Sequence, residues 1–473
     1  MKEWRQWLKS RGFTCLLWVA LCFTLTSAVY LSWLNRLIAL AGGAVADWLS
    51  MVAGYLFQAA GLGVVVHLQR RYPGADRKKH FRTAALLFGV ASVPALLADT
   101  AIGAAAFGFA MNLSCGVIAG FYLYAIAAAV EPERRGLVFG GGYALATVVV
   151  GLLALIDRGG FLHGQYALLL YLPLCLAAAL VTLRLDLLDP PGEAATPPEA
   201  ASGRDLALAC AVVALLSLVK NLGFCFPSAD IAAGLVPELS RIPYALGLAA
   251  AGWINDRSRR HGMVCAVAAL AIPFIMLTLT SEPVPATICW GLDYIFYAFF
   301  SVLRAALFLD LAARSRHWEL APLGLLMGRL GDAAGTALGM LLAVNRVALI
   351  AVTAALFFPT VLLCFRLYWK LYEPEVVREK SEQEVFEAFC LHNDLSSRER
   401  EVLRMVLANR ANGEIAEALF ITESTVKYHV HNMLQKTGCK NRTELQRKYA
   451  AALYPGIKDA PALTVLAKED AGA

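Results

Sequence analysis

The stretch GWINDRSRR, residues 252–260, places a glycine, an aspartate and a pair of arginines in a fixed order directly after a long apolar segment. The stretch GVVVHLQRR, residues 63–71, repeats this frame, G-x-x-x-[HD]-x-x-R-R, after an earlier apolar segment. A glycine lets two membrane helices approach closely, and a polar residue followed by arginines suits the membrane face and the loop beyond it. The repeat therefore predicts a duplicated helical membrane protein in which each frame latches one helix to another.

The composition supports a membrane-embedded chain, because 59% of the 473 residues are hydrophobic. A helix needs about 20 apolar residues to cross about 30 Å of hydrocarbon. The sequence therefore predicts an all-α, polytopic bundle of twelve spans. These lie near residues 13–35, 46–67, 83–101, 105–130, 137–156, 165–185, 205–226, 231–253, 263–281, 284–308, 319–344 and 347–369.

Basic residues are distributed unevenly between the loops on the two sides of this bundle. With the N-terminus placed inside, the N-terminus and the even-numbered loops hold nineteen Lys and Arg residues, whereas the odd-numbered loops hold only Arg36, Arg158 and Arg346. Loops that stay in the cytoplasm are enriched in positive charge. We therefore expect a multi-pass protein of the bacterial inner membrane whose N-terminus and C-terminal tail are both cytoplasmic.

A segment rich in proline, alanine and acidic residues, 186–204, has the composition of a flexible linker. It divides the bundle into two six-span halves, 1–185 and 205–370. The frame in the second half resembles the loop signature G-x-x-x-D-R-x-G-R-R of the major facilitator superfamily. This resemblance implies a transporter-like bundle whose halves rock against each other. It is carried by Gly252, Asp256, Arg257, Arg259 and Arg260.

Ionisable residues inside the spans concentrate in the second half, and such residues are costly in lipid. Glu238 and Arg241, like Arg329 and Asp332, lie three residues apart and therefore share a helix face. Two interpretations remain open. The charges form internal ion pairs that lock helices together, or they line a polar cavity that binds a small charged or zwitterionic ligand. The candidate cavity residues are Lys220, Glu238, Arg241, Asp293, Arg304, Arg329 and Asp332.

The composition changes after residue 370, where the apolar spans end. Residues 371–394 are strongly acidic and are predicted to form a helical connector. Residues 395–453 carry ten basic and six acidic side chains and are predicted to form a domain of four short helices, followed by a tail over 454–473. The excess of positive charge is consistent with a nucleic-acid partner.

Helix caps mark the elements of this domain. Ser396 and Glu399 form a capping box for the first helix, residues 409–412 form the break after it, and Thr422 caps the third helix. Two short helices joined by a tight turn, the second more polar on its outer face, make a helix-turn-helix arrangement. The apolar stripe of the third helix turns four positions outward as candidates for a DNA groove: Ser424, Lys427, Tyr428 and His431.

The domain resembles the LuxR-type (GerE-like) DNA-binding domain at many positions. The resemblance implies that a four-helix domain binds double-stranded promoter DNA as a homodimer, with its last helix helping to pair the subunits. It also implies that Lys427, Tyr428 and His431 reach the major groove and that Thr425 and Lys436 lie near phosphates. The matching positions are Leu395, Arg398, Glu399, Glu401, Val402, Leu403, Asn412, Glu414, Ile415, Ala416, Leu419, Thr425, Val426, Lys427, His429, Lys436 and Arg442.

The chemistry of the remaining sequence is limited. No glycine-rich phosphate loop, nucleophile elbow or pair of catalytic carboxylates occurs, so we expect no catalytic residues and no cofactor. The eleven cysteines are scattered without a C-x-x-C pair or a Cys/His cluster, so we expect neither a disulfide framework nor a metal site.

These observations favour a membrane-embedded one-component transcriptional regulator. In this hypothesis the bundle senses an unknown small-molecule ligand or the state of the membrane, and it controls the binding of promoter DNA. One alternative is a functional secondary transporter that carries a regulatory DNA-binding tail. A second alternative is a regulator whose membrane part is only an anchor.

Overall fold

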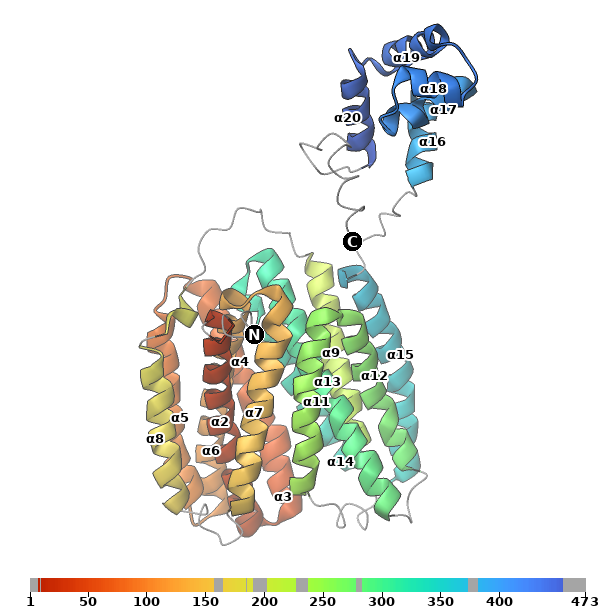
Figure 1. The fold of residues 1–473 in the computed structure, drawn as a ribbon. Helices are drawn as coiled ribbons and strands as arrows, with labels where there is room; N and C mark the ends of the chain where they lie inside the picture. The colour runs from red at the N-terminus through yellow and green to blue at the C-terminus, as the bar shows by residue number, and fades with distance from the viewer. Residues whose placement is uncertain are drawn as a thin grey trace. The chain divides into compact units, whose positions relative to one another are not determined.

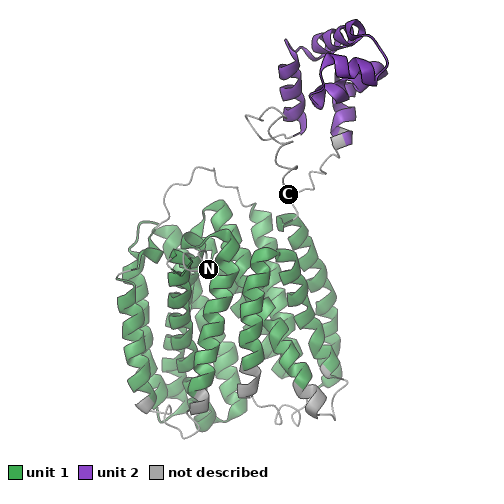
Figure 2. Cartoon of the chain, in the orientation of Figure 1, with its two compact units in different colours: residues 1–372 green, residues 373–473 purple. Residues whose placement is uncertain are grey.

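The structure is a computed structural model that describes residues 7–8, 10–156, 165–183, 185–189, 202–226, 237–277, 283–372 and 382–453 (Figure 1). The chain divides into two compact units, residues 1–372 and 373–473 (Figure 2). We call them the membrane unit and the C-terminal unit. Most of the predicted linker, residues 373–381 of the predicted connector and the predicted tail lie outside the described residues.

The described part of the membrane unit is all-helical, and each of the twelve predicted spans overlaps a helical segment. Nine of the described segments are long and apolar enough to cross a membrane, which makes this a multi-pass membrane protein. The helical segments of this unit are α2 (Arg11–Ala41), α3 (Gly43–Asp47) continued by the π-helix η1 (Trp48–Gly54) and α4 (Tyr55–Arg71), α5 (Arg77–Leu97), α6 (Ala101–Ala129), α7 (Arg135–Ile156), α8 (Gln165–Val181), α9 (Gly203–Phe224), α11 (Pro237–Arg257), α12 (Arg259–Met276), α13 (Pro283–Ser315), α14 (Leu323–Leu342) and α15 (Arg346–Tyr372). The nine do not include α8, α11 or α12.

Helices α2–α8 form one half of the bundle and α9–α15 form the other (Figure 1). The halves meet mainly where α7 packs on α11 and where α4 packs on α14. The α7–α11 crossing is close because glycines face each other there. A Cβ atom on Gly252 would lie 2.5 Å from the carbonyl oxygen of Gly136, a distance that real Cβ contacts do not reach. The predicted role of Gly252 in close helix approach is therefore confirmed.

The corresponding glycine of the first half, Gly63, has no such neighbour. A Cβ atom there would meet only the Leu326 side chain, at 3.7 Å, which is an ordinary van der Waals contact. His67, Arg70 and Arg71 are exposed, and within the described part of the chain their side chains form no hydrogen bond or ion pair. The prediction of a latch was therefore wrong for this copy, because α14 opposes Gly63 with a leucine side chain rather than with a glycine.

Several helix ends lie at one end of the bundle. Arg11, at the start of α2, donates a hydrogen bond of 2.6 Å to the Asp186 carbonyl oxygen in η4 (Asp186–Leu188). Lys370, near the end of α15, pairs with Asp205 near the start of α9. Figure 1 shows these helix ends together at the top of the bundle. The first described span therefore begins at the end of the bundle from which the last span leaves.

The C-terminal unit contains the predicted helix-turn-helix. Ser396 and Glu399 form the predicted capping box, and Thr422 caps the third predicted helix. Asn409, in the predicted break, adopts a left-handed conformation with a φ of 58°. The described helices are α16 (Glu382–His392), α17 (Ser397–Leu407), α18 (Asn412–Ala418), α19 (Glu423–Thr437) and α20 (Arg442–Leu453).

Helix α16, the described part of the predicted connector, adds a fifth helix to the four that were predicted. Its side chains Val385, Phe386, Phe389 and Cys390 are buried in the core of the C-terminal unit. The ring of Phe389 meets the ring of Tyr449 in α20 edge-on, with the ring centroids 5.4 Å apart. Helix α16 is therefore part of this unit's core.

Candidate DNA-binding face and ligand cavity

Helix α19 carries the residues that were predicted to face a DNA groove. Val426 and Met433 are fully buried, so the opposite side of the helix faces outward. The four residues on that side are all exposed, and Tyr428 keeps 63% of its surface accessible. The outward orientation agrees with the sequence analysis, and contact with DNA stays a prediction. The four residues are Ser424, Lys427, Tyr428 and His431.

The ammonium group of Lys427 makes only a weak ion pair within the protein. Its Nζ atom lies 3.8 Å from the carboxylate of Glu423, and the side chains remain 67% and 58% exposed. Exposed ion pairs of this kind contribute about 0–1 kcal/mol to stability. A phosphate or a base edge can therefore replace Glu423 as the partner of Lys427 at little cost.

Thr425 and Lys436, which were predicted to lie near phosphates, both take part in internal bonds. The Thr425 hydroxyl lies 2.8 Å from the hydroxyl of the threonine that caps α19. Lys436 Nζ donates to the Glu399 carboxylate at 2.7 Å and to the Asp394 carbonyl at 2.9 Å. Burial opposes ionisation of Glu399, but the hydrogen bonds from Lys436 and from a backbone N–H outweigh it and lower the pKa of this carboxyl. One of the three N–H donors of Lys436 remains for a phosphate.

In the membrane unit, Lys220 and Asp293 form a closed ion pair. Lys220 Nζ lies 2.6 Å from Asp293 Oδ2, and the two side chains are 0% and 1% exposed. Lys220 Nζ also lies 4.1 Å from the centroid of the Phe224 ring. This arrangement fits the interpretation of an internal ion pair better than that of a ligand contact. Glu238 and Arg241 belong to α11, but their side chains lie outside the described residues.

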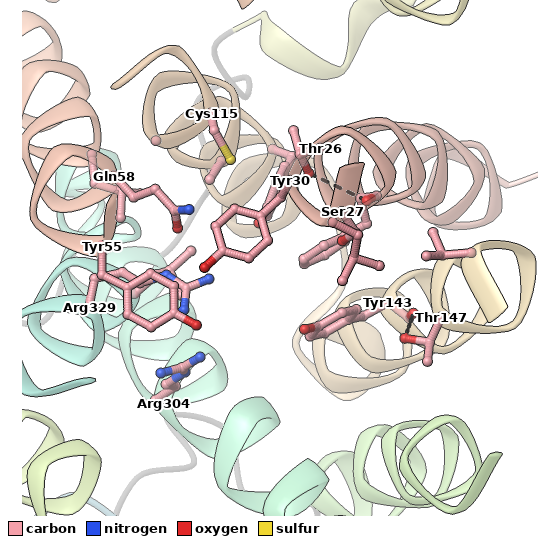
Figure 3. Close-up of a pocket in the computed structure, with 18 of the residues that line it drawn as sticks. Thr26, Ser27, Tyr30, Tyr55, Gln58, Cys115, Tyr143, Thr147, Arg304 and Arg329 are labelled. Carbon is pink, nitrogen blue, oxygen red and sulfur yellow. Dashed lines mark hydrogen bonds between the residues drawn. The ribbon is translucent and has the colours of Figure 1, made fainter. Parts of the chain in front are cut away.

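A cavity of about 250 Å³ lies between the two halves of the bundle (Figure 3). Of the predicted cavity residues, Arg304 and Arg329 line it, whereas Lys220, Asp293 and Asp332 do not. The sequence analysis missed the tyrosines of the lining, because tyrosine is also enriched at membrane interfaces and its presence in a span is not specific. They are Tyr30, Tyr55, Tyr122, Tyr143, Tyr244 and Tyr297.

Asp256, the acidic residue of the second frame, joins the two halves. Its two carboxylate oxygens accept hydrogen bonds from the backbone N–H groups of Gly136 and Leu137, both at 2.7 Å. These N–H groups belong to the first turn of α7, where they have no partner within the helix and where the helix dipole favours a negative charge. Asp256 in the second half therefore caps a helix of the first half.

A second carboxylate, Asp310 in α13, extends this contact. Arg259 donates two hydrogen bonds to it, from Nε at 2.8 Å and from Nη2 at 3.0 Å. Arg135 of the first half lies 3.7 Å from Asp310, and Arg259 lies 3.3 Å from Asp256. We call Arg135, Asp256, Arg259 and Asp310 the latch cluster. The cluster borders an open pocket of about 350 Å³, but its side chains are nearly buried.

The latch cluster also holds the end of the membrane unit. The hydroxyl of Tyr372, the last residue of α15, donates to Asp310 Oδ2 at 3.0 Å. Arg314 of α13 donates to the Leu371 carbonyl at 2.9 Å. The sequence analysis missed Arg135, Asp310 and Tyr372, because charged and aromatic residues are ordinary at the ends of spans.

The C-terminal unit is similar to known regulatory proteins. Residues 393–449 match the family described as bacterial regulatory proteins, luxR family. The chain is 44% identical over 50 residues to the spore germination protein GerE of Bacillus subtilis (strain 168), which covers 11% of this chain and 68% of that protein. It is 46% identical over 50 residues to the CsgBAC operon transcriptional regulatory protein of Escherichia coli (strain K12), which covers 11% of this chain. The chain spans only 23% of the length of that regulator.

The membrane unit is similar in fold to a solved transporter. The crystal structure of the human organic anion transporter MFSD10 (TETRAN) matches with a TM-score of 0.56 and 14% sequence identity, covering 75% of this chain and 99% of that chain. At this identity the likeness shows the fold alone. The predicted major-facilitator-like fold of the bundle is confirmed.

Proposed function

Because the chain belongs to the luxR family of bacterial regulatory proteins through residues 393–449, we propose that it is a membrane-embedded one-component transcriptional regulator. The C-terminal unit binds promoter DNA, and the membrane unit controls this binding in response to a signal. The proposal includes no enzymatic step.

One hydrogen bond carries the proposal that the membrane unit exerts this control. Tyr372, which donates to Asp310 at 3.0 Å, is the last residue before the segment that leads to the C-terminal unit. Asp310 also pairs with Arg259 and with Arg135 of the opposite half. The end of the membrane unit is therefore bonded to the cluster that holds the two halves together.

A rocking motion of the halves supplies the physical step. When α7 separates from α11 at this end of the bundle, Asp256 loses its two backbone donors and Asp310 loses Arg135. The remaining cluster then holds two acidic groups and only one basic group, so Asp256 and Asp310 compete for Arg259 and the bond from Tyr372 to Asp310 changes with them. The position of the end of α15 thereby depends on whether the halves are closed. A ligand drives this change only if it binds the two states with different affinity.

The proposal places both ends of the membrane unit on the cytoplasmic side of the inner membrane. The uneven distribution of basic loop residues supports this orientation, as does the arrangement in which the first described span begins where the last one leaves. On DNA we expect a homodimer, with Lys427, Tyr428 and His431 in the major groove and Thr425 and Lys436 near phosphates.

The DNA-binding face is tested on residues 382–453, which have a hydrophobic core of their own. Duplexes bound by this fragment are first selected from a random pool. Lys427→Ala is expected to weaken binding to a selected duplex about tenfold, because it removes a charged groove contact. Arg404→Ala, which changes an exposed arginine on α17 whose only ion pair among the described residues is with Glu387, is the matched control. If Lys427→Ala bound the duplex as tightly as the unaltered fragment, the assignment of Lys427 to the DNA groove would be wrong.

The coupling is tested with a reporter gene behind the selected promoter. Asp256→Asn, which weakens the latch cluster, should change reporter output in cells that express the full chain. In a Tyr372→Phe background the same substitution should have no effect, because the hydroxyl that links α15 to Asp310 is absent. A change of equal size in both backgrounds would show that Tyr372 carries no signal.

The major-facilitator fold favours one alternative, a secondary transporter with a regulatory DNA-binding tail. Accumulation of a ligand in vesicles that contain the protein would support this alternative. A response to ligand without accumulation supports the regulator. Unaltered regulation after replacement of the bundle by one unrelated span would indicate that the membrane unit is only an anchor.

A further inference from the structure

Two guanidinium groups at the edge of the cavity share one carboxylate. Arg304 Nη1 lies 3.0 Å and Arg329 Nη1 lies 3.3 Å from the same oxygen, Oδ2 of Asp332. The other oxygen of Asp332 accepts a hydrogen bond of 2.9 Å from Asn221. Both oxygens of Asp332 are therefore engaged, and this group of charges carries one positive charge in excess.

The described residues that line the cavity contain no aspartate or glutamate that would neutralise this charge. The Nε atoms of Arg304 and Arg329 are buried and have no hydrogen-bond partner among the described residues. A buried donor without a partner is costly, and a buried charge without a counter-charge is more so. The Nε atoms themselves are enclosed by protein, so a ligand in the cavity would meet the unbalanced positive charge of the two arginines, of which Arg329 keeps 22% of its side chain accessible.

We infer that the cavity binds a small organic monoanion, a carboxylate with an aromatic or apolar body, whose negative charge faces Arg304 and Arg329. One negative charge balances the excess, and a carboxylate matches the planar fork of a guanidinium group. The tyrosine rings of the lining, with Phe23, Leu31 and Leu62, provide an apolar and aromatic surface for the body. This inference rests on the proposed function, since it names the class of signal that the membrane unit senses.

The rings around the two arginines hold them in place for this role. The guanidinium carbon of Arg329 lies 4.4 Å from the centroid of the Tyr55 ring, and that of Arg304 lies 5.1 Å from the centroid of the Phe300 ring. Figure 3 shows Tyr30 and Tyr55 of the first half beside Arg304 and Arg329 of the second. A bound anion therefore contacts both halves, and its affinity depends on whether they are closed.

The test measures binding to the purified full chain in detergent without DNA. The probes are benzoate, phenylacetate and octanoate, each compared with its uncharged primary amide, and binding is followed by titration calorimetry. We expect at least one acid to bind about tenfold or more tightly than its amide, because the amide lacks the charge. Arg329→Gln should remove this preference, since Arg304 and Asp332 then neutralise each other.

Arg257→Gln makes the same change at an exposed arginine outside the cavity and should leave acid binding unaltered. Arg329→Lys keeps the charge without the fork, so acids should still bind more tightly than amides, with lower affinity. If Arg329→Gln no longer melts cooperatively, and so fails to fold, Arg329→Lys becomes the test. Equal binding of acids and amides, no binding of any acid at millimolar concentration, or unchanged acid binding by Arg329→Gln would overturn the inference.

Failure of the proposed function gives a different result. If an acid binds through Arg329 but reporter output does not respond to it, the ligand site stands and the sensing role fails. If Lys427→Ala and Asp256→Asn behave as expected while no acid binds, the regulator stands and the carboxylate site is refuted.

Discussion

The two halves carry the same sequence frame, but among the described residues the polar side chains bond across the halves only in the copy at 252–260. There, Asp256 accepts two backbone hydrogen bonds from the start of α7, and Gly252 lies against Gly136. In the copy at 63–71, His67 is exposed and Gly63 faces a leucine side chain. The difference teaches that a shared spacing places residues at the end of a helix, whereas the opposing helix decides what they do there.

The acidic position should show the largest difference between the two copies. Asp256→Asn removes a buried charge that two backbone N–H groups and Arg259 share, and we expect a loss of about 2–4 kcal/mol in the free energy of unfolding. His67→Asn should change it by less than about 0.5 kcal/mol, as is usual for an exposed residue. Unfolding by SDS in mixed micelles, followed by tryptophan fluorescence, measures both. Equal losses would remove the distinction between the copies.

The glycine position should show the next largest difference. Gly252→Ala forces the Gly136 carbonyl away from α11, and overpacking of this kind costs about 1–3 kcal/mol. Gly63→Ala has room for its methyl group and should be neutral or stabilising by up to about 1 kcal/mol, because alanine favours the helix over glycine. The same unfolding assay compares the two variants. A destabilised Gly63→Ala would indicate a close contact in the first half.

The first arginine of each pair should differ by a smaller amount. Arg259→Lys replaces a two-bond contact with Asp310 by a single point charge, and we expect a loss of about 1–2 kcal/mol in the same assay. Arg70→Lys, at the matching position of the first frame, should leave stability unchanged because Arg70 is exposed. If Arg259→Lys left the free energy of unfolding unchanged, the two-bond contact of Arg259 with Asp310 would contribute nothing to stability.

The smallest difference concerns pH, at the helix caps that follow the two frames. Asp76 accepts a hydrogen bond of 2.9 Å from the Lys79 N–H at the start of α5, and this bond lowers the pKa of Asp76. Ser258 takes the same place at the start of α12 and does not titrate. A lowered pKa stabilises the folded state above the ordinary Asp pKa of about 3.9, and this stabilisation is lost as the pH falls.

We therefore expect the first turn of α5, but not that of α12, to lose amide protection in acid. Hydrogen exchange at acidic and neutral pH measures this protection. Asp76→Ser should make the two caps respond alike, whereas an acid response of α12 in the unaltered protein would contradict the explanation.

The sequence predicted much of the fold because apolar length, helix caps and loop signatures are local properties. The twelve apolar stretches correspond to helical segments, and Ser396, Thr422 and Asn409 occupy their predicted places. The sequence also contains the information needed to predict that α16 packs into the core of the C-terminal unit. Val385, Phe386, Phe389 and Cys390 have helical apolar spacing, but the acidic composition of the segment concealed it.

The candidate cavity was harder to predict, because the rotation of each span decides which side chains face one another. Lys220 and Asp293 looked as available as Arg304 and Arg329 in the sequence, yet the first two neutralise each other outside the cavity lining. The tyrosines of the cavity come from both halves, and no local pattern connects them. Their assembly follows only from the packing of α2, α4, α6, α7, α11 and α13.

The glycine crossing between Gly136 and Gly252 has a consequence for genetics. Every missense change in either codon adds a side chain where none fits, and it does so without changing the C-terminal unit. A selection for alleles whose output no longer follows the stimulus should therefore recover recurrent hits at these two codons. In such alleles the expression of the target gene would stay constant whether or not the stimulus is present. Second-site changes that restore the response should map to the opposing helix.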